Sequence, residues 1–140
     1  MRGSSKSGAF LVEMIIIIAF FAAASAICVR LFVHAHSIST ESRNINMAMN
    51  SFQTAAECFK LAGGDVDEVL DMLPDCSLAD TDLLVVYYDS SWSTTGHTEN
   101  GGFRMEILIG NENSLMVAAI VVWPNSGDAP LYEGKVYSYA

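Results

Sequence analysis

The sequence predicts an α+β protein in which one long N-terminal helix, its first half spanning a membrane, packs on a small antiparallel β-sheet of three to four strands. Three observations predict this fold class. An almost wholly apolar segment fills residues 9–33. A stripe of apolar residues at helical spacing follows it. After residue 82, short runs rich in β-branched and aromatic residues alternate with turn-forming residues.

The first segment has the length and composition of a membrane-spanning helix. Residues 14–29 carry no charge, and they make about 24 Å of helix at about 1.5 Å per residue. The apolar residues on either side extend this to the roughly 30 Å of a bilayer core, and Arg30 can reach the far interface. Because Arg2 and Lys6 precede the span, the positive-inside rule predicts a single-pass protein of the cytoplasmic membrane, with its N-terminus inside and its C-terminal domain outside.

The helix is predicted to continue over residues 34–62 as an amphipathic segment. No proline interrupts it, and Gly63-Gly64 predicts its end. A helix over residues 9–62 is about 80 Å long, and its second half needs a surface to pack on. The apolar residues recur at steps of three, four or seven: Ile38, Ile45, Met49, Phe52, Ala56 and Phe59.

Residues 65–140 are predicted to form an extracytoplasmic α+β domain. Asp65, with Glu68 three residues later, predicts the start of a short helix, and Pro74 predicts its end. The remainder has the pattern of an antiparallel meander packed on the second half of the long helix. Its strands are predicted over residues 83–88, 103–109, 115–123 and 132–139, with the last strand at an edge.

The longest predicted loop covers residues 90–102, which are rich in serine, threonine and glycine. Such a loop is exposed and is a favourable place for a contact between subunits. Trp92 within it has two interpretations. It either anchors such a contact or folds back on its own sheet.

The charge of the predicted outer domain excludes one class of partner. The chain has a formal net charge of -9, and residues 65–140 hold 13 acidic side chains but only two basic ones, Arg104 and Lys135. So acidic a surface repels the phosphates of nucleic acids and anionic lipid headgroups. We therefore expect no direct binding of nucleic acid.

Glu13 does not fit a plain membrane anchor, because it lies near the start of the apolar segment. A carboxylate at mid-bilayer costs about 2.5–3.5 kcal/mol on insertion scales, and such a residue usually has a function. It needs a positive partner. The sequence offers none on the same helix except a nearby amino terminus.

The residues around Glu13 resemble the cleavage motif of type IV prepilins and pseudopilins. The motif reads Gly8-Ala9-Phe10-Leu11-Val12-Glu13, after a short basic leader and before a long apolar helix. In that family a membrane peptidase cuts after the glycine and methylates the new N-terminus. The resemblance implies that residues 1–8 are the leader and that Ala9 begins the mature chain. The family usually has phenylalanine directly after the scissile bond; here Ala9 takes that place and Phe10 follows, a departure that bears more on methylation than on cleavage.

The same resemblance implies a pilin-like fold and a structural function rather than an enzymatic one. The chain would be a subunit of a type IV pilus, a type II secretion filament or a competence-type filament at the cell surface, and Ala9 favours a minor subunit or a pseudopilin. Glu13 would meet the N-terminal ammonium of a neighbouring subunit and set the register of the helix bundle, in which Phe10 also lies. The implied partners are other pilin or pseudopilin subunits, prepilin peptidase, the inner-membrane assembly platform and the membrane.

The N-terminal segment also fits a secretory signal peptide or an unprocessed anchor. A signal peptide has a basic start and an apolar core, and Ala24-Ser25-Ala26 offers a small-x-small cleavage site; against this, the chain stays apolar as far as Val33. The unprocessed single-pass anchor would carry an extracytoplasmic binding domain. Lipidation at Cys28 is disfavoured, since the preceding Ile27 is too bulky for a lipobox.

Cys58 and Cys76 lie on the predicted outer side of the membrane, where oxidation is permitted. A disulfide between them would close a loop in the unfolded chain and stabilise the fold by about 3 kcal/mol in the chain-entropy model. Two free, buried thiols are the alternative.

The sequence shows no catalytic constellation, and we expect no cofactor. His34 and His36 are two residues apart and point to different faces of a helix, so a shared metal is not expected. The acidic residues after Gly64 lack the spacing of an EF-hand calcium loop and are interpreted as a solvated surface. No nucleophile elbow, phosphate-binding glycine loop or zinc cluster is present in the sequence.

Overall fold

The computed structural model describes residues 4–139, so the first three residues of the predicted leader, Arg2 among them, lie outside the described residues. Within that range the chain forms two helices and six strands. It divides into two compact units, one up to Ser42 and one from Arg43. Helix α1 (Ser4–Leu61) contributes to both units.

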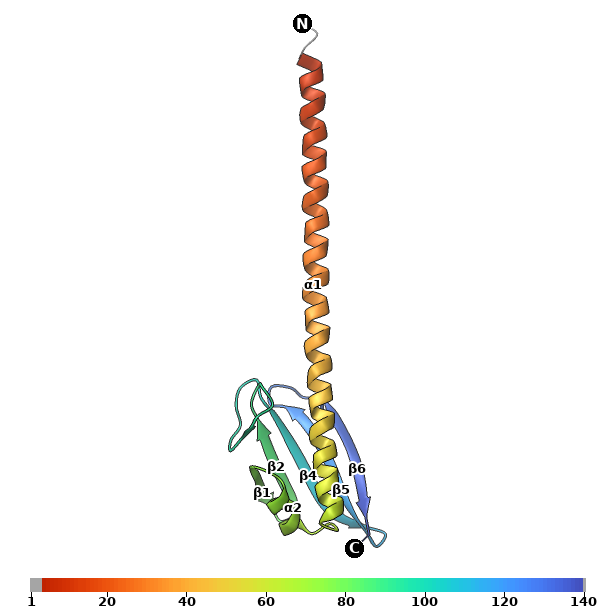
Figure 1. Ribbon diagram of the computed structural model, residues 1–140, viewed down its shortest axis with the longest axis vertical. Coiled ribbons are helices and arrows are strands. Elements are labelled where there is room, and N and C mark those ends of the chain that lie inside the picture. Colours follow the sequence, from red (N-terminus) through yellow and green to blue (C-terminus); the bar gives the residue numbers. More distant parts are fainter. Residues whose placement is uncertain (1–3, 140) are drawn as a thin grey trace. The chain divides into compact units, whose positions relative to one another are not determined.

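The first unit is helical from Ser4 onward (Figure 1). The sequence predicts that the helix begins at Ala9. In the structure it begins five residues earlier, at Ser4, so the serines and Lys6 of the predicted leader belong to the same helix. None of these residues is a proline, and none of them adopts a positive φ.

The second unit contains an antiparallel six-stranded sheet, so the prediction of three to four strands was too low. Strand order is β1-β2-β4-β5-β6, and β3 pairs with β2 beside β1. The last strand lies at an edge, as predicted. The strands are β1 (Cys76–Asp80), β2 (Leu83–Tyr88), β3 (Thr94–Thr95), β4 (Phe103–Glu112), β5 (Leu115–Pro124) and β6 (Tyr132–Ser138).

The two additional strands carry weak local signals. β1 has the sequence CSLAD, in which four of the five residues are exposed, so the alternation of buried and exposed residues that marks a strand is missing. β3 is only two residues long and lies inside the predicted loop. Both strands form by pairing with the edge of β2, β1 through the tight turn between Asp80 and Leu83 and β3 through the short segment after Tyr88, and their own residues do not mark them as strands.

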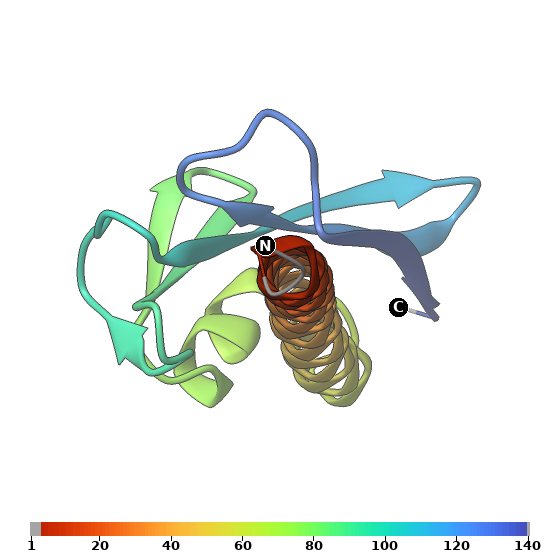
Figure 2. The same ribbon diagram turned by 90° about the horizontal axis from the view of Figure 1, so that it is seen from above.

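The part of α1 from Arg43 onward packs on one face of the sheet, and α2 (Val66–Met72) lies on the same side (Figures 1 and 2). The helix contributes small and aromatic residues to the core, among them Ala48, Ala55 and Phe59, each fully buried. Alternate residues of the central strands meet them. The buried residues of β4 are Phe103, Met105, Ile107 and Ile109, and those of β5 are Ala118, Ile120 and Val122.

Helix α1 ends in a glycine-dependent turn, as the sequence predicts. Gly63 and Gly64 both have positive φ, of 59° and 89°. The N–H of Gly64 bonds to the carbonyl of Phe59, and the N–H of Gly63 bonds to that of Lys60. This is the hydrogen-bond pattern of a Schellman motif, which satisfies the last carbonyls of a helix.

Helix α2 begins where the sequence predicts it. The Asp65 carboxylate accepts hydrogen bonds from the N–H groups of Asp67 and Glu68, at 3.0 and 3.1 Å. These bonds satisfy two of the otherwise unpaired donors at a helix start. α2 buries Val69 and ends at Met72, with Leu73 as its C-cap, one residue before Pro74.

Strands β4 and β5 form a longer hairpin than predicted. The sequence predicts that one strand ends at residue 109 and the next begins at residue 115, but Gly110, Asn111 and Glu112 continue the ladder with β5. Only Asn113 and Ser114 remain in the turn, and both have positive φ, of 55° and 69°. A two-residue turn of this kind matches the twist of the flanking strands.

Candidate functional site

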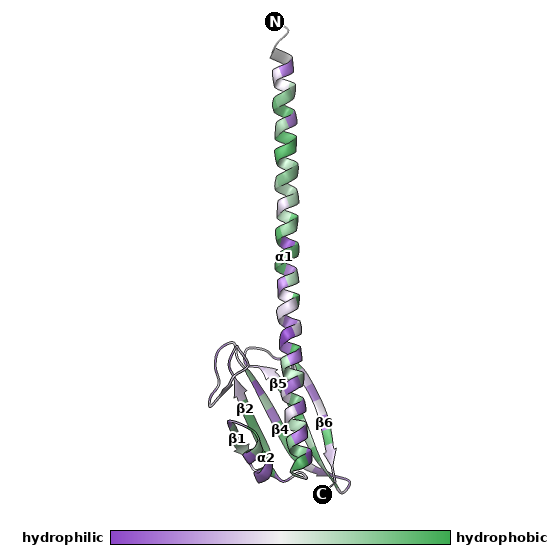
Figure 3. Cartoon of the chain, in the orientation of Figure 1, coloured by the Kyte–Doolittle hydropathy of each residue, from purple (hydrophilic) through white to green (hydrophobic). Residues whose placement is uncertain are grey.

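The apolar segment of the first unit is exposed on all sides. The helix is long and apolar enough to cross a membrane by length and composition, and Figure 3 colours the residues of its upper part mostly as hydrophobic, with a hydrophilic band near the top. Its large apolar side chains between Phe10 and Val33 are 42–76% exposed. An uncovered apolar surface of this size marks a membrane or protein contact, and a helix that is apolar all round must be buried by one of the two.

Four predicted site residues lie together at the start of this segment. Gly8, Ala9, Phe10 and Glu13 are all in α1 and all exposed. Ala9 and Glu13 are four residues apart, so they lie on one face of the helix, one turn from each other. Each is therefore accessible to a peptidase, to lipid or to another helix.

Glu13 has no charged partner within the described residues. The ion pairs formed between residues 4 and 139 join other side chains. The nearest positive side chain in the sequence is Lys6, seven residues earlier, which is roughly 10 Å along the helix axis. In an apolar environment an ionised carboxylate at this place therefore needs a positive partner that residues 4–139 do not supply.

The three cysteines are free thiols in the structure. Cys28 is exposed on the apolar segment, whereas Cys58 and Cys76 are half-buried and pack against the core of the second unit. Burial raises the pKa of both of these thiols above the ordinary value of 9.0. They are therefore protonated and weakly nucleophilic near neutral pH. The disulfide between them stays a prediction.

Trp92 folds back on its own domain, which is the second of its two interpretations. It is only 7% exposed, and its ring stacks on Phe103 with 4.0 Å between centroids and an interplanar angle of 14°. Its Nε1 donates a hydrogen bond to Asn44 of α1. No sequence pattern predicts this contact, because Asn44 and Trp92 are 48 residues apart and neither belongs to a motif.

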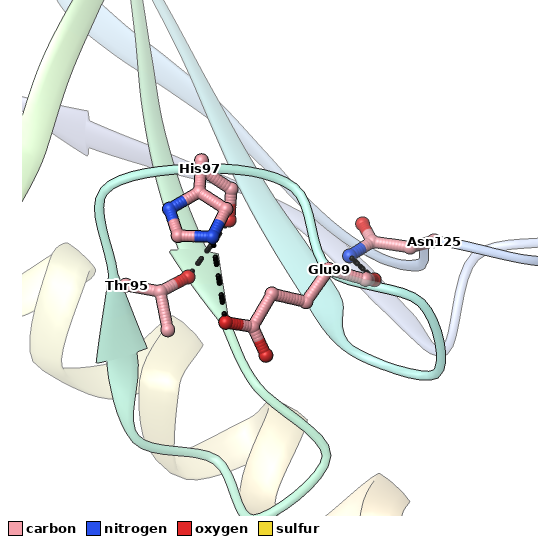
Figure 4. A network of polar contacts seen from close by, with 4 residues as sticks. All are labelled: Thr95, His97, Glu99 and Asn125. Carbon is pink, nitrogen blue, oxygen red and sulfur yellow. Dashed lines mark hydrogen bonds and ion pairs between the residues drawn. The ribbon is translucent and has the colours of Figure 1, made fainter.

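The rest of the same loop is held by a small polar network (Figure 4). The Thr95 hydroxyl donates to the carbonyl of His97 at 2.8 Å, and the His97 Nε2 lies 3.5 Å from a carboxylate oxygen of Glu99. Asn125 donates from its side chain to the Glu99 carbonyl at 2.9 Å. The His97 and Glu99 side chains are 73% and 43% exposed, so the network orders a surface loop and does not form an enclosed site.

Metal ligands are not brought together in the part of the chain that the structure describes. Between residues 4 and 139, no three histidine, cysteine, aspartate or glutamate side chains could hold one ion. His34 and His36 are exposed on α1. In the acidic run after Gly64, Asp65 serves as a helix cap and Asp75 accepts a hydrogen bond from Thr94.

Comparison of the chain with protein-family models, with curated proteins and with solved structures gives no match. Its function is therefore inferred from the residues and from their physical chemistry.

Proposed function

We propose that this chain is a structural subunit, a pilin or pseudopilin, of a type IV-like filament and that prepilin peptidase processes it after Gly8. The observation that carries the proposal is an exposed apolar helix with a carboxylate four residues after Ala9 that has no charged partner between residues 4 and 139. A plain anchor needs the apolar surface, but it gains nothing from Glu13.

Cleavage after Gly8 would make the positive group that Glu13 lacks. Water adds across the amide bond between Gly8 and Ala9, giving a carboxylate on Gly8 and an ammonium on Ala9. The same cut removes Arg2 and Lys6, which hold the precursor at the inner face of the membrane. The mature helix then starts with a charge that is complementary to Glu13 of a neighbouring copy.

Bundling of the mature helices would cover both the apolar surface and this charge pair. Side chains such as Phe10 and Phe32, which are 60% and 76% exposed in the single chain, exchange lipid contacts for contacts with other subunits. A buried ion pair adds little net stability, but a register that leaves one partner unpaired is strongly disfavoured, by about 3–5 kcal/mol. Glu13 therefore selects the register, and helix packing supplies most of the contact.

The second unit suits the outer coat of such a filament. Its core is closed by its own part of α1, by α2 and by the sheet, so it keeps its fold before and after assembly. Its surface is strongly acidic, which favours solubility and opposes unspecific association between domains. In the proposed function prepilin peptidase acts on the membrane-held precursor, and the inner-membrane assembly platform and other subunits act on the processed chain.

The test is the intact mass and N-terminal sequence of the full chain, co-expressed with prepilin peptidase or with an inactive variant of that enzyme. We expect a mature chain that begins at Ala9, with or without one added methyl group, only with the active enzyme. A chain that still begins at Met1 with the active enzyme would support the unprocessed anchor. A chain that begins at Ile27 would mean an exported soluble domain and would contradict the proposal.

A further inference from the structure

One face of the sheet carries no helix within residues 4–139. α1 and α2 both lie on the opposite side (Figure 2), and the side chains of the helix-free face alternate with the core residues along each strand. We call this surface the outer sheet face. Its apolar residues are Leu83 of β2, Leu108 of β4, Val117, Ala119 and Val121 of β5, and Tyr137 of β6. Leu108 is 54% exposed, and an uncovered apolar surface marks a contact with another molecule.

The outer sheet face differs in charge from the rest of the domain. Residues 65–140 hold 13 acidic side chains and two basic ones, and both basic ones, Arg104 and Lys135, lie on this face. Arg104 bonds to Glu106 at 2.8 Å, and Lys135 lies 3.7 Å from Glu112. Acidic surfaces elsewhere on the domain repel another copy of the chain. The outer sheet face, with charges of both signs, is therefore the place where a second copy can approach.

The register of β4 and β5 places large side chains opposite small ones on this face. Leu108 lies opposite Ala119, and Gly110 lies opposite Val117. A two-fold axis that runs along the strands between β4 and β5 exchanges these positions between two copies, so Leu108 of each copy meets Ala119 of the other. Such a contact is isologous, and every pair of residues in it occurs twice. The hollow that receives Leu108 has a volume of about 320 Å³ and is lined by Ala119, Val121, Glu133, Gly134 and Lys135.

The same axis brings opposite charges together. One row of side chains crosses the sheet from Leu83 to Lys135 through Leu108 and Ala119. Asp82 is exposed in the turn just before Leu83, at the end of the row away from Lys135. Exchange of the two ends puts the Lys135 ammonium of each copy beside the Asp82 carboxylate of the other. The ion pair that Lys135 forms within its own chain is exposed and contributes little, so it does not oppose this contact.

We propose that the outer sheet face is an interface at which two copies of this chain pack face to face, with Leu108 of each copy seated over Ala119 of the other. The inference goes beyond the proposed function and does not depend on cleavage after Gly8. Four strands about 4.8 Å apart and about 20 Å long give a flat area on the order of 400 Å² per copy. A standard interface buries about 800 Å² of accessible surface per partner. The dimer is therefore expected to be weak, with a Kd in the micromolar range.

The experiment measures the dimer fraction of the full chain in detergent by sedimentation over a range of protein concentrations. Leu108→Asp is expected to raise the dimer Kd by on the order of tenfold or more, because it places a charge at the centre of the contact. Leu78→Asp is the matched control and is expected to leave the Kd unchanged. Leu78 is a leucine of similar exposure, 50% against 54%, but it lies opposite the buried Leu84 on the other side of the sheet. Near-ultraviolet circular dichroism checks that both variants are folded.

An exchange of charges tests the two-fold arrangement. Lys135→Asp and Asp82→Lys are each expected to raise the Kd severalfold, because each places like charges together at both ends of the contact. The double variant restores opposite charges and is expected to recover most of the wild-type affinity. Failure of this recovery would overturn the proposed register of the two copies.

Three further results would overturn the interface itself. The first is a wild-type chain that stays monomeric throughout the micromolar range. The second is Leu108→Asp that dimerises as the wild type does, because association would then run through the apolar part of α1. The third is an equal loss of affinity in Leu78→Asp, because the effect would then come from added charge and not from the outer sheet face.

Discussion

The indole Nε1 of Trp92 donates a hydrogen bond of 3.2 Å to the side-chain oxygen of Asn44, which ties the loop after β2 to α1. The loop adopts a strained conformation at this point, since Trp92 has a φ of 66°, uncommon for a bulky residue. The Asp89 carboxylate supports the turn by accepting hydrogen bonds from the N–H groups of Ser91 and Ser93, at 2.7 and 3.0 Å. Stacking on Phe103 completes the arrangement.

The Trp92 contact predicts two mutational effects of different size. Trp92→Ala should lower the free energy of unfolding by about 3 kcal/mol, because it removes a buried aromatic ring. Asn44→Ala should lower it by about 1 kcal/mol, the typical value of one hydrogen bond. Urea unfolding of the full chain in detergent, followed by near-ultraviolet circular dichroism, measures both. Asn46→Ala, an exposed position on the same helix, is the control, and an equal effect at both asparagines would contradict the assignment.

Gly134 of β6 lies against the Phe52 ring of α1. A Cβ at Gly134 would sit 2.8 Å from the Cζ of Phe52, and that ring is already packed edge-on against Tyr132, with 5.0 Å between centroids. Gly134→Ala should therefore destabilise the fold by about 1–3 kcal/mol through overpacking. Gly110→Ala in β4 is the matched control, since its Cβ would meet only Val117 at 3.9 Å. Combining Gly134→Ala with Phe52→Leu should recover part of the loss in a thermal melt, and no recovery would count against this contact.

The sequence was most informative where local chemistry decides the structure. The bounds of β2 agree with the prediction, and Asp65 caps α2 as expected, because β-branched runs and capping side chains act over a few residues. The sequence does not predict the edge strand β1, because four of its five residues are exposed and the alternation of a half-buried strand is missing.

The contacts between distant residues could not be predicted in the same way. Asn44 with Trp92 and Phe52 with Gly134 join α1 to segments far along the chain, and no local period marks either pair. The candidate site, by contrast, could be predicted from a local pattern. Gly8, Ala9 and Glu13 are recognised by their spacing on one helix, and the structure adds that the surface around them is exposed.

The β4–β5 turn predicts a substitution that stabilises the protein. Ser114 has a φ of 69°, a conformation that costs an L-residue roughly 1–2 kcal/mol and that glycine adopts freely. Ser114→Gly also completes the Asn-Gly pair that two-residue hairpins prefer. We expect a gain of about 0.5–1 kcal/mol in the free energy of unfolding. Ser138→Gly, in a strand and without positive φ, should instead lower stability, and a loss at both positions would contradict the turn assignment.

The second unit should lose stability at alkaline pH. Burial raises the pKa of the Cys58 and Cys76 thiols above 9.0 and that of the Tyr88 phenol above 10.0. A group whose pKa is higher in the folded state contributes stability below its unfolded pKa and loses it as pH rises through the folded pKa. Unfolding midpoints of the reduced chain should therefore be level up to about pH 8 and fall beyond it. Cys58→Ala/Cys76→Ala should weaken this fall, and an unchanged profile would mean that Tyr88 alone causes it.

Glu13 provides the last prediction, on assembly. Glu13→Ala should leave the chain in the membrane, because removing a carboxylate eases insertion by up to about 2.5–3.5 kcal/mol, but filament yield should fall strongly since the Ala9 ammonium of a neighbour loses its partner. Glu13→Gln keeps the shape without the charge and should fail in the same way. Ser25→Ala, a polar position in the same apolar segment, is the control. The host must carry an assembly system that accepts the wild-type chain. Membrane fractionation measures the first effect, and the yield of sheared filaments measures the second. A wild-type yield of filaments from Glu13→Ala would contradict the role proposed for this carboxylate.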